Sequence, residues 1–170
     1  MTNEIQNVDV NTGEILQTEE VIRDTEDYTI VLQADGRYRK DMKYKKYYSL
    51  VPESKEDSIE LYKILNSQDN EKVTPMAQMK NKEIEIHQVY TNPYQSFDEN
   101  TGGNINGVTT TIQTKDGFIA TSSKSVYYTL FQLFDVFGYP NTPDYEPIKV
   151  KVIGVRMANG TQINLELLNA

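Results

Sequence analysis

The alternation of apolar and polar residues predicts mostly strands in the second half of the chain. Residues 82–90 alternate through Ile84 and Ile86 and then shift phase at Val89. A shift of this kind is typical of a β-bulge, where a strand bends as it follows a barrel. We therefore expect one long, bent strand here, followed by a loop rich in Asn and Gly over residues 92–107.

Two further pairs of strands are predicted, each joined by a turn that contains glycine. The first pair is 108–114 with 118–121, turning at Asp116-Gly117. The second pair is 148–153 and 155–157 with 163–167, turning at Asn159-Gly160. Both are expected to be tight hairpins.

A largely buried helix is predicted between these hairpins, over residues 125–137. Ser122 or Ser123 precedes it as the N-cap, and Gly138 ends it. The residues that recur at helical spacing on its apolar stripe are Val126, Leu130, Leu133 and Phe137.

The predicted order over residues 81–170 is therefore three strands, a helix and two strands. A five-stranded oligonucleotide-binding (OB) barrel has this order, with the helix between strands three and four closing one end. Rossmann-type parallel sheets need a helix after nearly every strand, which this order does not supply. The expected fold is mainly β (α+β), and an α+β sandwich of another topology is the alternative.

Residues 28–80 are expected to form an N-terminal extension of the barrel. Residues 28–33 are extended in pattern, turn at Asp35-Gly36 and continue to 47–51, which predicts a long hairpin. Residues 66–80 are polar and are interpreted as a linker.

A short amphipathic helix is predicted over residues 55–65, capped by Ser54. Its apolar stripe consists of Ile59, Tyr62 and Leu65.

The net charge of -8 is concentrated at the N-terminus. Residues 1–27 hold eight acidic residues against a single base, Arg23, so the other 143 residues carry a net charge of only -1. This segment has no aromatic residue and no sustained periodicity, so it is expected to be a disordered acidic tail. Such a tail would keep the protein soluble or recruit partner proteins.

Several classes of function are excluded or disfavoured by residue usage. The chain has no cysteine, which excludes disulfides and thiolate sites, and its one histidine, His87, excludes a multi-histidine metal centre. No phosphate-binding loop, Rossmann glycine pattern or hydrolase motif is present. No run of apolar residues is long enough to span a membrane. We expect a cytoplasmic, non-enzymatic protein without a cofactor or metal.

The segment 37–48 is the strongest candidate for a binding site. It holds six cations and four tyrosines in twelve positions, with one acidic residue, Asp41. Cations neutralise phosphates and aromatic rings stack on bases, so this mixture favours single-stranded nucleic acid. The candidate residues are Arg37, Tyr38, Arg39, Lys40, Lys43, Tyr44, Lys45, Lys46, Tyr47 and Tyr48.

The alternative is a structural role for the same segment. On a strand, the even positions Tyr38, Met42, Tyr44 and Tyr48 would form a buried face, and the cations at odd positions would face water. The two interpretations are compatible, because a strand with one buried face still presents its other face to phosphates.

Two smaller groups complete the predicted site. His87, Tyr90, Tyr94 and Phe97 lie on the first barrel strand and in the loop after it, next to the surface where OB barrels bind. Lys149, Lys151 and Arg156 lie on the fourth strand and alternate with apolar residues. Core packing for the aromatic residues and surface solvation for the cations are the alternatives.

Residues 82–168 resemble the single-stranded DNA-binding proteins of small phages of Gram-positive hosts. The similarity lies in the stretches Gly107-Val-Thr-Thr-Thr-Ile, Ala120-Thr-Ser-Ser-Lys-Ser-Val, Phe131-Gln-Leu-Phe-Asp-Val-Phe-Gly and Ile148-Lys-Val-Lys-Val. It covers about half of the chain. The resemblance implies a replication protein that coats displaced single strands in the host cytoplasm during viral genome copying. An acidic tail at the N-terminus departs from the usual C-terminal position.

The sequence thus predicts a protein that binds single-stranded DNA with little sequence preference, with RNA as an alternative ligand and oligomers allowed. Replication proteins are candidate partners of the acidic tail. A different class remains open, namely an acidic phage protein that mimics DNA and inhibits a host protein. The cations of segment 37–48 argue against that alternative, and a structural virion component is disfavoured by the lack of repeats and long helices.

Overall fold

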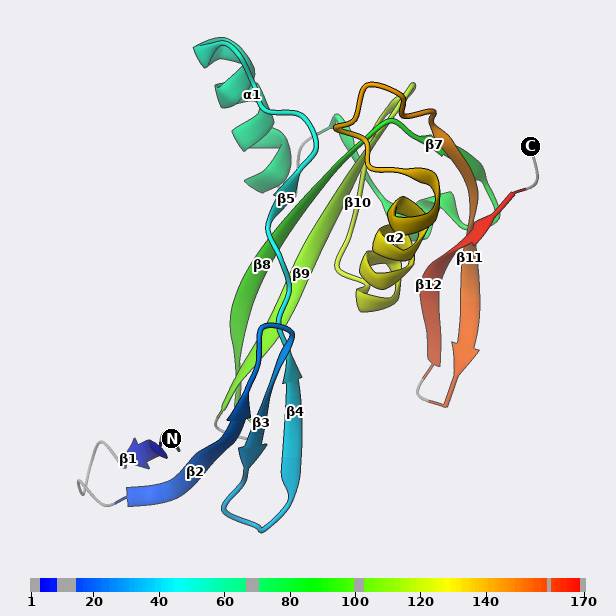
Figure 1. The fold of residues 1–170 in the computed structure, drawn as a ribbon. Coiled ribbons are helices and arrows are strands. Elements are labelled where there is room, and N and C mark those ends of the chain that lie inside the picture. The colour runs from blue at the N-terminus through cyan, green and yellow to red at the C-terminus, as the bar shows by residue number, and fades with distance from the viewer. Residues whose placement is uncertain (1–3, 9–14, 67–70, 100–102, 159, 169–170) are drawn as a thin grey trace. The chain divides into compact units, whose positions relative to one another are not determined.

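The computed structural model describes residues 4–8, 15–66, 71–99, 103–158 and 160–168 (Figure 1). The chain divides into two compact units. The first unit comprises residues 1–44 and 94–107, and the second comprises 45–93 and 108–170. This division differs from the expected boundaries at residues 28 and 81, because strands β8 (Gln88–Asp98) and β9 (Gly103–Thr114) contribute residues to both units.

Two sheets contain the strands of the second unit. The remaining strands are β5 (Tyr47–Tyr48), β6 (Val73–Pro75), β7 (Glu83–Ile86), β10 (Gly117–Thr121), β11 (Ile148–Met157) and β12 (Gly160–Leu167). One sheet has the order β5-β8-β9-β10-β6 and the other has the order β12-β11-β7.

A strand break at His87 allows one stretch of chain to serve both sheets. Before the break, β7 pairs antiparallel with β11, and after it β8 lies beside β9. The backbone N–H of His87 itself donates to the carbonyl of Gln113 at 2.9 Å. Residues 82–90, predicted to form one bent strand, thus belong to two strands in different sheets, and both predicted hairpins, β9–β10 and β11–β12, form.

The mainly β fold with two α-helices is confirmed in the described residues, but the closed five-stranded barrel is not. β10, β9 and β8 are neighbours, and β7, β11 and β12 are neighbours, as an OB barrel requires. However, the second neighbour of β10 is β6, which pairs with it in parallel, Ile119 opposite Thr74. β6 therefore takes the edge of β10 that a closing strand would need.

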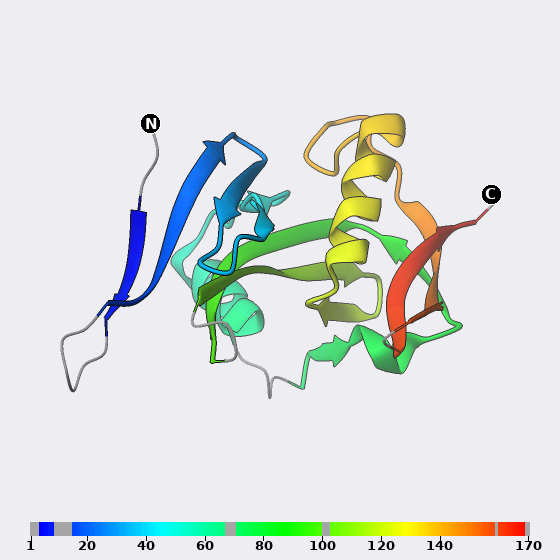
Figure 2. The same ribbon diagram turned by 90° about the horizontal axis from the view of Figure 1, so that it is seen from below.

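Helix α2 (Lys124–Phe137) covers the core of the second unit and contacts β12 (Figure 2). Ser123 caps it by accepting from the Val126 N–H, and Gly138, with φ of 101°, ends it. Its buried side chains are Val126, Tyr127, Leu130 and Phe134. The predicted stripe is wrong at Phe137, which is 52% exposed because the helix ends there.

Helix α1 (Lys55–Asn66) forms where predicted and is capped by Ser54, which accepts from the Asp57 N–H at 3.1 Å. Its buried side differs from the predicted stripe. Ile64 is buried, whereas Ile59 and Tyr62 are exposed. Tertiary neighbours determine which side of the helix is buried. Ile64 lines the same cavity as Tyr90 and Phe118 of the sheet.

The region interpreted as a linker, 66–80, holds regular structure in its described part. It contains β6 and a 3-10 helix, η1 (Met76–Met79). Met76 is 1% exposed and belongs to the apolar core. Pairing with β10 and burial of this side chain explain why a polar segment is ordered here.

The first unit contains a four-stranded antiparallel sheet of order β1-β2-β3-β4. Its strands are β1 (Glu4–Val8), β2 (Ile15–Asp24), β3 (Tyr28–Leu32) and β4 (Tyr38–Met42). The composition of residues 1–27 predicts disorder, yet β1 and β2 lie there, because pairing of β1 with β2 and of β2 with β3 satisfies their backbone groups. The hairpin that starts at residue 28 ends at Met42, and β5 pairs with β8 instead.

The expected loop over residues 92–107 is also largely strand. β8 extends to Asp98 and β9 begins at Gly103. Tyr94 and Phe97 therefore lie on a strand rather than in a loop. Among the described residues, no helix has the length and apolar character needed to cross a membrane.

We predict that Leu130→Ala destabilises the protein strongly. Leu130 is 0% exposed on α2, so its truncation leaves a cavity that costs about 2 to 5 kcal/mol. Urea unfolding followed by far-ultraviolet circular dichroism measures the change. The matched control is Val136→Ala on the same helix, where the side chain is 76% exposed and the change should stay within about 0.5 kcal/mol. Equal unfolding midpoints for the two variants would contradict the packing described above.

Candidate nucleic-acid interface

The two faces of the first unit's sheet carry different chemistry, because successive residues of a strand point to opposite faces. On β4, Arg39 and Asp41 share one face, and Tyr38 and Lys40 share the other. The strand pairing places Tyr38 opposite Leu32 and Lys40 opposite Ile30 of β3. The two cations of β4, Arg39 and Lys40, thus point to different faces.

Arg39 is held in a structural ion pair. Its Nη1 and Nη2 donate to the two carboxylate oxygens of Glu19 at 2.9 and 3.2 Å, and its Nε donates to Asp41 at 2.9 Å. Glu19 is 3% exposed. The hydrogen bonds with Glu19, and then those with Asp41, raise the pKa of Arg39 above its usual value. Two carboxylates already neutralise Arg39, which does not favour the predicted contact with phosphate.

The opposite face presents aromatic rings and cations together. Tyr38 is 69% exposed, and Arg37 and Lys40 beside it are exposed. Lys40 Nζ lies 4.4 Å from the centroid of the Tyr28 ring, and Arg23 Cζ lies 5.7 Å from it. We call Arg23, Tyr28, Tyr38 and Lys40 the Tyr28–Tyr38 face; Arg37 lies just before β4 and is exposed next to Tyr38 in sequence.

Sequence reasoning missed Arg23 and Tyr28 because they lie outside the basic segment. Strand pairing brings them to it, since Tyr28 is opposite Met42 and Arg23 is opposite Ile30 in the sheet. The predicted hairpin after Tyr28 was the one signal that could have pointed to this residue.

Lys43 and Tyr44 follow β4. Lys43 Nζ donates to the Asp24 carboxylate and to the carbonyl of Thr25, and the hydrogen bond from Lys43 lowers the pKa of Asp24. Both partners are exposed, so this ion pair is screened by solvent and adds little stability. Tyr44 is half-buried.

Two tyrosines of the predicted site pack within the second unit, Tyr90 buried and Tyr47 half-buried against the core. The Tyr47 ring packs edge-on against Phe131, with centroids 5.7 Å apart, and Tyr90 is 2% exposed. Burial raises the pKa of both phenols. These contacts do not favour the predicted stacking of the two rings on bases.

Lys45, Lys46 and Tyr48 remain candidates on the second unit. Tyr48 is half-buried against Tyr90, its hydroxyl donates to Asn92 at 2.9 Å, and Lys46 Nζ lies 4.7 Å from its ring centroid. Lys45 has an exposed side chain, while its backbone N–H donates to the Tyr127 hydroxyl. The backbone is thus fixed while both ammonium groups stay at the surface.

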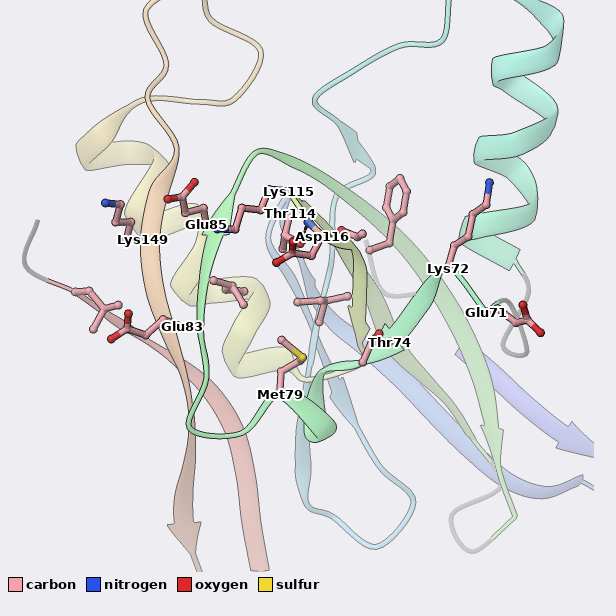
Figure 3. A pocket seen from close by; sticks show the side chains of 15 residues that line it. Glu71, Lys72, Thr74, Met79, Glu83, Glu85, Thr114, Lys115, Asp116 and Lys149 are labelled. Atoms are coloured by element: carbon pink, nitrogen blue, oxygen red, sulfur yellow. Dashed lines mark hydrogen bonds between the residues drawn. The ribbon is translucent and has the colours of Figure 1, made fainter.

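The cations of β11 lie among acidic residues. Lys149 pairs opposite Glu85, and Lys151 pairs opposite Glu83 and Glu166. Lys149, Glu83 and Glu85 line a cavity of about 530 Å³ (Figure 3). Arg156 is exposed near the end of the strand. The mixed charge of this cavity does not favour a phosphate backbone.

The contacts of His87 and Tyr94 within the protein favour a structural role for both residues. His87 Nε2 lies 3.3 Å from a Glu85 oxygen without hydrogen-bond geometry, at the break between β7 and β8. The Tyr94 ring lies directly on Gly107, where an added Cβ would come within 2.4 Å of Cζ. Phe97 differs from both, because its ring is 66% exposed.

The family of this chain is shown by its similarity to a known protein over nearly the whole sequence. The chain is 33% identical over 173 aligned residues to the "Single-stranded DNA-binding protein" of Bacillus phage GA-1. The alignment covers 99% of this chain and 96% of that protein. This chain belongs to the phage single-stranded DNA-binding proteins. No family model and no solved structure matches it.

Membership in the phage single-stranded DNA-binding proteins confirms the resemblance predicted from residues 82–168. It also extends it, because the aligned region includes the N-terminal sheet and the Tyr28–Tyr38 face. The alternative of a DNA-mimicking inhibitor has no comparable support.

We predict that Arg39→Ala loosens the first unit while Lys40→Ala does not. Loss of Arg39 leaves the buried Glu19 carboxylate without its partner, at a cost of up to about 3 kcal/mol. Lys40 is exposed, and its truncation should cost less than about 0.5 kcal/mol. Hydrogen exchange read by mass spectrometry over β2, β3 and β4 makes the comparison. Unchanged protection of these strands in Arg39→Ala would show that the ion pair is not structural.

Proposed function

We propose that this chain binds single-stranded DNA through the Tyr28–Tyr38 face, with little sequence preference. The observation that carries the proposal is the Tyr38 ring, 69% exposed on β4 with exposed cations at Arg37 and Lys40 on either side of it in sequence. A soluble domain has no structural need for a large exposed ring among cations. The name of the phage GA-1 relative supports the same ligand.

In the proposed binding, aromatic rings stack on bases and cations neutralise phosphates. A base stacked on an aromatic side chain contributes about 1 to 3 kcal/mol, and every base has a ring face, so stacking does not select a sequence. Each cation that neutralises a phosphate releases a counterion and makes binding weaken with salt. Lys40 and Arg23 already lie near the Tyr28 ring, so they are placed to contact a backbone next to it.

The second unit contributes Lys45, Lys46 and Tyr48 to the proposal. We also interpret β7 to β12 as an OB-type arrangement in which β6 takes the edge of β10, an interpretation that the neighbour order supports. The role that follows is coating of displaced strands during phage genome copying in the host cytoplasm. Recruitment of replication proteins by residues 1–27 and assembly into oligomers stay predictions.

The test is a titration of a fluorescently labelled dT strand of about 30 bases, read by anisotropy at several salt concentrations. We expect tight binding that weakens with salt, and weak binding to a duplex of equal length. The same titration with a U strand decides between DNA and RNA. Absence of binding to the dT strand at low salt would contradict the proposal.

We predict that Tyr38→Ala weakens binding to the dT strand about tenfold, because one stacked base is lost. The matched control is Tyr62→Ala on α1, where a tyrosine of almost equal exposure, 68%, lies outside the proposed face. This control should bind as the unmodified protein does. Equal losses in the two variants would place the bound strand elsewhere.

A further inference from the structure

The first unit contains a cavity on the face of the sheet opposite to Tyr38. Its volume is about 290 Å³, just below the range of about 300 to 1,000 Å³ that holds drug-sized ligands. The sheet contributes Glu19, Arg39 and Asp41 to its lining. The ends of β8 and β9 contribute Gln95, Phe97, Asn104 and Asn106.

The charges in this cavity exclude a phosphate as its occupant. Glu19 and Asp41 supply two carboxylates, and the single guanidinium of Arg39 is hydrogen-bonded to both. The lining is therefore negative overall and repels an anion. A neutral polar group that can hydrogen-bond is favoured instead.

The amide side chains of the cavity suit the edge of a nucleobase. An amide carries both donors and an acceptor, as base edges do. Gln95 Nε2 donates to Asn106 Oδ1 at 3.1 Å, and Asn106 Nδ2 donates to the carbonyl of Met42 at 3.0 Å, so these two are fixed in place. Asn104 is exposed, and among the described residues its amide has no hydrogen-bond partner.

Phe97 supplies the remaining element, a ring face for stacking. Its ring is 66% exposed although it lines the cavity. An apolar ring at the mouth of a polar cavity fits a ligand that is flat, aromatic on its faces and polar at its edges. A nucleobase has these properties.

We propose that this cavity takes one nucleobase of the bound strand, with Phe97 stacked on the base and Asn104 hydrogen-bonded to its edge. The inference rests on the proposed function, which concerns the opposite face of the same sheet. Because the Asn104 amide can present either its oxygen or its nitrogen, it accepts the edge of any base. The cavity thus adds affinity that depends on the presence of a base and not on its identity.

The experiment compares a dT strand with a strand of the same length that carries abasic residues, each titrated over a range of salt concentrations. Phe97→Ala and Asn104→Ala should weaken binding of the dT strand, Phe97→Ala by about tenfold. Neither should weaken binding of the abasic strand. The slope of log affinity against log salt should stay unchanged, because no phosphate contact is removed.

The matched control is Ile105→Ala, which removes an apolar side chain that is 42% exposed next to Asn104 but does not line the cavity. It should bind both strands as the unmodified protein does. Circular dichroism verifies that all variants fold, as expected for exposed positions.

The outcomes separate the two proposals. If the unmodified protein binds the dT strand and Phe97→Ala binds it equally well, the cavity proposal is overturned and the proposed function stands. A changed salt slope in Phe97→Ala would also overturn it, because the side chain would then act through the backbone contacts. If the unmodified protein binds neither strand, both proposals fail.

Discussion

The buried carboxylate of Glu19 constrains the whole N-terminal sheet. A carboxylate that is 3% exposed must be neutralised, and Arg39 meets it with two parallel hydrogen bonds. This requirement fixes the side of β4 that faces Glu19. Tyr38 and Lys40 must then point the other way, because side chains alternate along a strand. This ion pair therefore determines which face of the sheet each β4 residue of the basic segment occupies.

In the second unit, one stretch of chain contributes strands to two sheets. The break at His87 lets one stretch of chain pair with β11 and then with β9, so both sheets close over the same core. That core joins Ile86 and Val89, on either side of the break, to Leu130 and Phe134 of α2. Tyr47 is drawn into contact with it, which explains why a tyrosine of the basic segment is unavailable for stacking.

The net charge of a nucleic-acid-binding protein describes its surface poorly when charges are paired. This chain is acidic overall, yet Glu19, Asp41 and Asp24 each bind a cation of the basic segment. Lys40 is exposed on the other side of the sheet, and Arg37 is exposed just before β4. Acidic residues here hold some cations in ion pairs and leave others at the surface, so the two faces of the sheet differ in their charged groups.

The sequence by itself determined the elements whose signals are local. Strand alternation, the Asp116-Gly117 turn, the Ser54 cap, a cap at Ser122 or Ser123 and the phase shift at Val89 all depend on residues close together in the chain. It also located the basic segment and the family resemblance. Tertiary structure alone decided that β1 and β2 are strands, that β6 takes the edge of β10, and that Ile64 rather than Ile59 is buried. It also showed that Arg39, Tyr47 and Tyr90 have structural contacts, whereas Tyr38 is exposed. It placed Tyr28 on the same face of the sheet as Tyr38. Burial and strand partners depend on residues distant in the chain.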